Sequence, residues 1–174
     1  MSLWSAFKSL FTGRSDSRIV APIISEPQLR GFENEFRLPN DPPYAIRINQ
    51  RSPKGLPSRL AEFVAVAGTA QADVRVHAEA FIAGSGRSIE LTRLPDHPFD
   101  PNAVAVIGRW SDAGGEHCER LGYLPAEIAA KIARVHPETP IGATIKILYA
   151  SDSRRNPGIR LDLWIPRRKR PKAD

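Results

Sequence analysis

Short apolar segments recur along residues 62–165, and several of them alternate between apolar and polar positions, as half-buried strands do. The expected strands cover residues 62–69, 88–94, 103–107, 120–123, 143–149 and 159–165. Gly68 follows the apolar part of the first segment, and Asn156, Pro157 and Gly158 form a turn sequence between the last two. A loop is expected at residues 111–117. The pattern therefore predicts a domain built mainly from short antiparallel strands.

Two other segments favour helices. In residues 74–83, Ala78, Phe81 and Ile82 share one helical face and Gly84 ends the segment, although the alternation from Val74 onward also permits a strand. Pro125 precedes residues 126–134, and proline is well placed in the first turn of a helix. Six strands and two helices in mixed order predict a mainly β fold, namely a small six-stranded barrel of the OB-like or SH3-like type with an extended N-terminal region.

Residues 1–13 predict an amphipathic helix, because Leu3, Phe7 and Leu10 have helical spacing and Gly13 follows them. A helix of this length is marginal alone in water. Docking of residues 2–12 on the domain itself or on a partner protein, attachment to a membrane surface, and disorder therefore all stay open.

The remaining regions flank the expected domain at residues 62–165. Residues 14–61 are rich in proline and predict a linker, with one short edge strand possible at residues 44–49. Residues 166–174 form a basic tail. Its cations are Arg167, Arg168, Lys169, Arg170 and Lys172. Such a tail is either a solvated, disordered terminus or an arm that attracts phosphates.

Charge and composition narrow the choice of partners. The net charge of +6 and the isoelectric point of about 9.9 favour nucleic acid or an acidic membrane surface. Cys118 is the sole cysteine, so no internal disulfide can form and a four-cysteine zinc site is excluded. The four histidines are scattered, and we expect no metal and no other cofactor. No apolar run approaches the roughly 18 residues of a membrane span, and we expect a cytoplasmic protein.

Residues 94–106 combine turn formers, one aromatic ring and the start of a strand. The structural interpretation is that Asp100 and Asn102 bond nearby backbone amides, while the prolines hold the loop in place. The functional interpretation is that Phe99 offers a flat face for a nucleobase and that Asp100 accepts a hydrogen bond from a hydroxyl group.

The run from Arg93 to Val106, Arg-Leu-Pro-Asp-His-Pro-Phe-Asp-Pro-Asn-Ala-Val-Ala-Val, resembles the signature of the HIRAN domain family. The run Leu-Gly-Tyr-Leu-Pro from Leu121 resembles the second block of that family, which is also followed by a helix. The resemblance covers about residues 62–165. It implies a modified oligonucleotide-binding barrel that captures single-stranded DNA at its 3′ end, in proteins of DNA repair and replication.

The resemblance also implies roles for residues of the two blocks. Phe99 and Asp100 correspond to the aromatic and acidic residues that hold the terminal base and its 3′ hydroxyl, and Tyr123 lies beside the pocket. His97 stands where the family often has asparagine. Arg93 and Asn102 belong to the same block and complete the expected nucleic-acid-binding set, together with the basic tail.

One segment departs from the family pattern. End-binding members carry an Arg-Tyr pair just after the glycine of the first strand, for a phosphate contact and for the second face of the base. This chain has Thr69, Ala70 and Gln71 there, without a ring or a cation. The departure implies weaker end binding or a different ligand.

Three functions remain in view. The first is a non-catalytic module that binds single-stranded DNA or DNA ends. The second is a metal-assisted hydrolase that uses Asp96, His97 and Asp100, although a two-metal site needs several convergent carboxylates and this block has two. The third is an adapter tethered to a membrane or a protein by residues 2–12.

Overall fold

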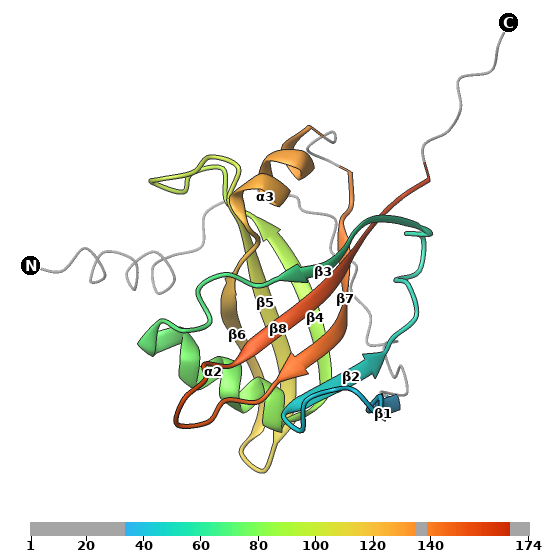
Figure 1. Cartoon of the computed structure of the whole chain (residues 1–174). Coiled ribbons are helices and arrows are strands. Elements are labelled where there is room, and N and C mark those ends of the chain that lie inside the picture. Colours follow the sequence, from blue (N-terminus) through green and yellow to red (C-terminus); the bar gives the residue numbers. More distant parts are fainter. Residues whose placement is uncertain (1–33, 135–138, 168–174) are drawn as a thin grey trace, which may run out of the picture.

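The computed structural model describes residues 34–134 and 139–167. Over these ranges the fold is mainly β, with two antiparallel sheets and two helices (Figure 1). The five-stranded sheet has the order β1-β2-β7-β8-β3, and the three-stranded sheet has the order β4-β5-β6. The strands are β1 (Asn34–Phe36), β2 (Ala45–Asn49), β3 (Ser58–Ala65), β4 (Ser85–Arg93), β5 (Val104–Asp112), β6 (Gly115–Tyr123), β7 (Gly142–Tyr149) and β8 (Gly158–Ile165). The helices are α2 (Ala72–Ala83) and α3 (Ala126–Ala133).

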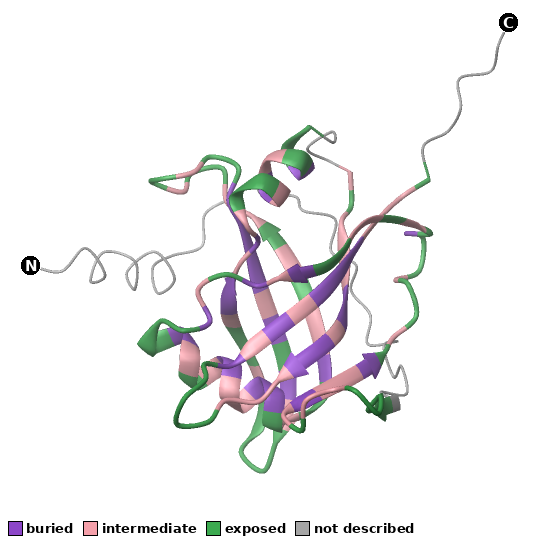
Figure 2. Ribbon diagram, viewed as in Figure 1, coloured by how far each residue is buried: buried purple, intermediate pink, exposed green. Residues whose placement is uncertain are grey.

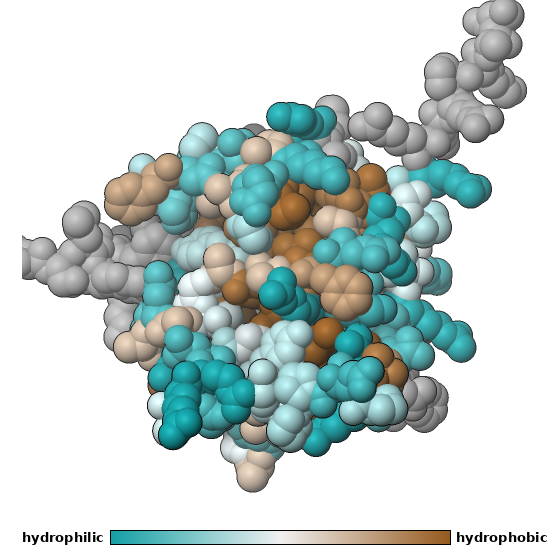
Figure 3. All heavy atoms as spheres, viewed as in Figure 1, coloured by the Kyte–Doolittle hydropathy of each residue, from teal (hydrophilic) through white to brown (hydrophobic). Residues whose placement is uncertain are grey.

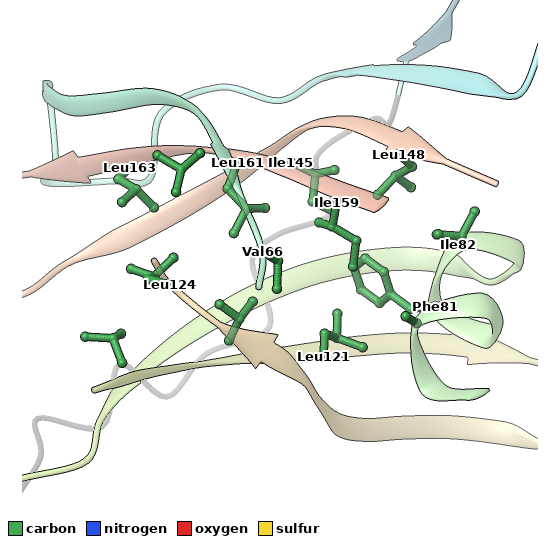
Figure 4. Packing of buried hydrophobic residues seen from close by; sticks show 14 of the residues in the cluster. Val66, Phe81, Ile82, Leu121, Leu124, Ile145, Leu148, Ile159, Leu161 and Leu163 are labelled. Carbon is green, nitrogen blue, oxygen red and sulfur yellow. The ribbon is translucent and has the colours of Figure 1, made fainter. Parts of the chain in front are cut away.

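The two sheets enclose one hydrophobic core between them (Figure 4). In β8, Ile159, Leu161 and Leu163 are at most 2% exposed and point into this core. Because side chains alternate along a strand, Arg160 and Trp164 of β8 point to the outer side of the five-stranded sheet. Figure 2 shows that the buried residues follow the central strands of both sheets. The apolar and polar positions that alternate in the sequence of β8 thus correspond to the inner and outer faces of the sheet.

Helix α2 covers part of the core beside the three-stranded sheet. Its buried residues are Val74, Ala78, Phe81 and Ile82, whose spacing places them on one helical face. The Phe81 ring meets the Trp110 ring edge-on, with 5.7 Å between the ring centroids. The helix predicted over residues 74–83 is therefore confirmed, and the alternative strand is wrong. The helix expected after Pro125 is confirmed as α3.

The closed six-stranded barrel expected from the sequence is wrong, because eight strands in the described ranges form two separate sheets. On one side the chain after β3 links the sheets: Val66 N–H donates to Ile159 O, while Ala67 and Tyr123 exchange two backbone hydrogen bonds. On the other side, between β4 and β7, the Gln50 side chain takes the place of a backbone ladder. Its Nε2 donates to Arg87 O at 3.3 Å, and its Oε1 accepts from Ile145 N at 2.8 Å.

The expected linker at residues 14–61 is wrong for residues 34–61, which belong to the folded unit. The short strand expected at residues 44–49 is confirmed as β2, which lies between β1 and β7 rather than at the edge. Ile48 of β2 is 1% exposed and packs in the core. The prolines concealed this arrangement, because β2 is stabilised by a partner strand about a hundred residues later in the chain.

Other boundaries follow the sequence less closely. The loop expected at residues 111–117 shrinks to a tight hairpin, because β5 and β6 pair as far as Asp112 and Gly115. The helix expected at residues 1–13, the first part of the linker, and the tail from Arg168 onward lie outside the described residues. Within the described ranges, no helix has the length and apolar character needed to cross a membrane.

Candidate nucleic-acid interface

Residues 94–103 connect β4 to β5 at the end of the three-stranded sheet that also carries α3 (Figure 1). The base of this loop is closed by a hydrogen bond of 2.8 Å from Leu94 N to Ala103 O. The Asp100 Oδ1 atom accepts from Asn102 N at 2.8 Å, and Ala103 N donates to Asp100 O. The turn role expected for Asp100 is confirmed, whereas Asn102 contributes its backbone amide. The loop is therefore fixed by local bonds, as its sequence suggests.

Phe99 lies in this loop with 82% of its surface exposed. Its backbone N–H donates to Nδ1 of His97 at 3.4 Å, and the His97 and Phe99 ring centroids are 6.0 Å apart. The centroid of Tyr123, at the end of β6, lies 5.5 Å from that of His97. The structure thus brings together Phe99, His97 and Tyr123, three of the residues expected from the two sequence blocks. We call these three residues the ring cluster.

Arg120 adds a cation to the ring cluster, and sequence reasoning missed it. Its Nη1 donates to the Tyr123 hydroxyl oxygen at 2.8 Å, and its guanidinium carbon lies 5.2 Å from the centroid of that ring. Its Nη2 lies 3.7 Å from Oδ2 of Asp73, in the first turn of α2. Arg120 is half-buried. The cluster therefore combines aromatic faces with a positive charge that is held in place by contacts on both sides.

A bulge in β6 explains why Arg120 was missed. Residues three apart in a regular strand point to opposite faces. The pairing of β5 with β6 shifts between Val106, which faces Gly122, and Ile107, which faces Arg120. The additional residue, Leu121, changes the alternation and lets Arg120 meet the Tyr123 side chain. A single sequence gives no signal for this bulge except the glycine beside it.

The segment that departs from the HIRAN pattern lies directly beside this cluster. The Ala67–Tyr123 bridge places the turn at residues 68–71 next to the end of β6. The Thr69 hydroxyl is buried and donates to Pro157 O at 2.8 Å, so it points into the fold. Residues 69–71 carry no cation, and Arg120 of β6 lies at the ring cluster.

The other expected binding residues lie elsewhere. Arg93 is half-buried, with guanidinium nitrogens 3.5 Å from Ile132 O in α3 and from Thr139 O, and its desolvation lowers the pKa of the guanidinium. Its contacts thus fix the position of α3 rather than extend the ring cluster. Arg167 is exposed just beyond β8. Arg168, Lys169 and Arg170 lie outside the described residues.

The acidic side chains of the loop are near the ring cluster but do not converge. Asp96 is exposed, and one oxygen of Asp100 is engaged in the turn to Asn102. In the part of the chain that the structure describes, no group of three or more histidine, cysteine or carboxylate side chains is arranged to hold a metal ion.

Comparison of the chain with protein-family models gave no match, and neither the curated proteins nor the solved structures gave a significant one.

Proposed function

We propose that this protein is a non-catalytic module that binds single-stranded DNA and prefers DNA 3′ ends, in a repair or replication setting in the cytoplasm. The observation that carries the proposal is the ring of Phe99, which is 82% exposed and lies beside His97. Exposure of an apolar ring to water is unfavourable, and an exposed ring contributes little to the stability of the fold. Proteins stack single-stranded bases on exposed aromatic faces near positive charge, and here Arg120 holds a positive charge at Tyr123, the third ring of the cluster.

We further propose that the chain is a divergent HIRAN domain with an OB-like fold. The oligonucleotide-binding barrel is itself only partly closed, so two sheets that share backbone hydrogen bonds on one side only are compatible with it. The two blocks that suggest the family come together around the ring cluster, since Phe99 belongs to the first and Tyr123 to the second.

Each part of the candidate site has a task in this proposal. The terminal base stacks on the open face of Phe99, and the Arg120 guanidinium attracts the phosphate behind it. The Oδ2 atom of Asp100 has no hydrogen-bonding partner in the described ranges, while Oδ1 is engaged with Asn102 N. An ionised carboxylate accepts but does not donate, so Oδ2 accepts from a 3′ hydroxyl group.

The chemistry at Asp100 gives the test of this proposal. A 3′ phosphate lacks the hydroxyl donor and adds negative charge next to the carboxylate, so oligonucleotides that end in a 3′ hydroxyl should bind more tightly than 3′-phosphorylated ones. The replacement Asp100→Asn keeps an oxygen acceptor for Asn102 N but removes the charge, and it should abolish most of this difference. Fluorescence anisotropy at low salt, with two oligonucleotides that differ only at the 3′ end, measures both effects.

Arg93→Gln serves as the control, because Arg93 belongs to the same sequence block but contacts α3. This variant should keep the end preference. Equal affinity of the unmodified protein for the two ends would contradict 3′-end recognition.

A further inference from the structure

We infer that the outer side of the five-stranded sheet is a second binding surface, over which the single strand continues after its end is held at the ring cluster. This inference rests on the proposed function. The surface, which we call the outer patch, consists of Arg59 and Phe63 of β3, Lys146 of β7, and Arg160 and Trp164 of β8. Figure 3 looks onto this side of β8 and shows hydrophilic and apolar side chains intermixed over it.

The backbone of β3 is distorted where it presents Phe63. The pairing with β8 shifts between Ala61 and Val64, and Phe63 adopts a φ of 51°, which residues other than glycine rarely adopt. Its N–H donates to Oδ1 of Asp162 at 3.1 Å instead of to a strand carbonyl. The ring is 43% exposed as a result. Bulges of this kind redirect a side chain, and here the fold accepts a strained residue that places an aromatic ring in water.

Cations accompany both rings of the outer patch. The Arg59 guanidinium carbon lies 4.8 Å from the Trp164 ring centroid, and Lys146 Nζ lies 5.8 Å from the Phe63 ring centroid. The Arg160 guanidinium donates to Phe63 O at 3.1 Å. A surface that alternates aromatic faces with positive charges matches a strand of bases and phosphates.

The positive charge exceeds what the fold needs for internal pairing. The buried Asp162 carboxylate has Arg59 Nε at 3.8 Å and Lys146 Nζ at 3.6 Å, and Glu62 also pairs with Arg59. These two cations and two carboxylates balance each other. Arg160 is then in excess, because it has no carboxylate partner in the described ranges.

The chain connects the outer patch to the ring cluster at one end and to Arg167 at the other. Phe63 and Ala67 are four positions apart in the chain, so their Cα atoms are at most about 14 Å apart, and Ala67 bridges directly to Tyr123 of the ring cluster. A stacked single strand rises about 3.4 Å per nucleotide, so roughly four nucleotides cover this span. At the other end, β8 leads into Arg167 and the basic tail.

Oligonucleotide length separates the outer patch from the ring cluster. The probes are oligothymidylates of two and twelve nucleotides. Binding of the shorter probe is measured by NMR titration and binding of the longer probe by fluorescence anisotropy. Phe63→Asn removes the ring, and asparagine tolerates positive φ. This variant should weaken binding of the longer probe by at least about fivefold and leave the shorter probe unchanged. Arg160→Gln should flatten the salt dependence of the longer probe by roughly 0.7 log units per log unit of salt.

Arg109→Gln is the matched control, since it makes the same charge change at an exposed arginine of β5, on the other sheet. Thermal unfolding of each variant gives the folded fraction used to correct the affinities. Equal effects of Arg160→Gln and Arg109→Gln, or displacement of the longer probe by polyglutamate at an equal concentration of charges, would overturn the inference. If the inference fails in this way but the preference for 3′ hydroxyl ends persists, only the second binding surface is refuted. If neither probe binds the unmodified protein, the proposed function and the second binding surface are both refuted.

Discussion

At the scale of single residues, two phenylalanines show what the fold uses and what it leaves available. Phe81 is 0% exposed and packs edge-on against Trp110 in the core. Phe99 is 82% exposed in the loop between β4 and β5. Burial of an aromatic side chain is a main source of stability, so Phe81 stabilises the fold and Phe99 contributes little to it. The proposed function uses this exposed ring for stacking on a base.

The change Phe99→Ala should therefore separate binding from stability. We expect its melting temperature to stay near that of the unmodified protein, while affinity for single-stranded DNA falls by about 1–3 kcal/mol. Phe99→Tyr keeps the stacking face and should retain affinity. Phe81→Ala, in contrast, should lower the free energy of unfolding by about 3–5 kcal/mol. Calorimetry and anisotropy on the same samples give both quantities, and a large loss of stability with unchanged affinity for Phe99→Ala would refute the stacking role.

At the scale of elements, the end of β6 connects the two sheets and positions Tyr123. Gly122 has a φ of 139°, and a Cβ atom at this position would lie 2.1 Å from Ala67 O. This close approach allows Ala67 and Tyr123 to exchange two backbone hydrogen bonds. Glycine is needed here for its backbone conformation and for its lack of a side chain.

Gly122→Ala should separate β6 from the chain after β3. A good control is Gly115→Ala in the hairpin, because Gly115 also has a positive φ, of 116°, but a Cβ atom there would meet nothing within 4 Å. Both variants carry the cost of the unfavourable φ, and the clash should make Gly122→Ala less stable by about a further 1–3 kcal/mol. Denaturant unfolding measures this difference. If the two variants proved equally stable, the Ala67–Tyr123 contact would have no structural importance.

At the scale of the whole molecule, electrostatics links stability to pH. The pKa values of four carboxylates are lowered, chiefly by hydrogen bonds from a nearby basic side chain. The pairs are Asp41 with Arg47, Glu79 with Arg75, Asp112 with His117, and Asp152 with Arg155. A carboxylate with a lowered pKa in the folded state binds protons more readily when the chain is unfolded. Its contribution to stability is present above its ordinary pKa and disappears as the pH falls through the folded value.

Asp41→Asn tests this dependence at one pair. Asp41 accepts two hydrogen bonds from Arg47 and one from Leu38 N, and its pKa lies below the ordinary value of 3.8. We expect the unmodified protein to lose stability as the pH falls from about 5 to below 3.8, and the variant to lose less over the same range. Asp96→Asn is the control, because Asp96 is exposed and has no ion-pair partner in the described ranges. Urea unfolding at each pH provides the comparison, and parallel curves for both variants would contradict the role of this pair.

The uneven positive charge of the whole chain predicts a salt effect on binding. Residues 167–174 carry five cations and one carboxylate, which is 5 − 1 = 4 of the net charge of +6. Affinity for single-stranded DNA should fall as salt rises, by roughly 0.7 log units per log unit of salt for each neutralised phosphate. Deletion of residues 167–174 should flatten this slope without a change in melting temperature. Replacement of the same cations by glutamine keeps the length of the tail and should flatten the salt dependence to the same extent. If neither change altered the slope, the tail would play no part in binding.

The sequence by itself determined the local structure of this protein. Strands occur at all six segments expected in residues 62–165, although the first, β3, begins and ends four residues earlier than expected; both described helices and the turn at Asp100 are present as well. Alternation, helical spacing and turn formers act over a few neighbouring residues. The sequence also singled out Phe99, His97 and Tyr123, which the structure brings together. That part of the candidate site was predictable because its residues lie in two compact blocks.

Only the tertiary structure decided how these parts combine. Strand β2 joins the five-stranded sheet through β7, and Gln50 takes the place of a ladder where a barrel would close. The bulges in β3 and β6 place Phe63 on the outer patch and Arg120 beside Tyr123, against simple alternation. The physical reason is the same in each case: strand partners and bulges depend on hydrogen bonds and packing between segments far apart in the chain, and these energies are absent from any local pattern of residues.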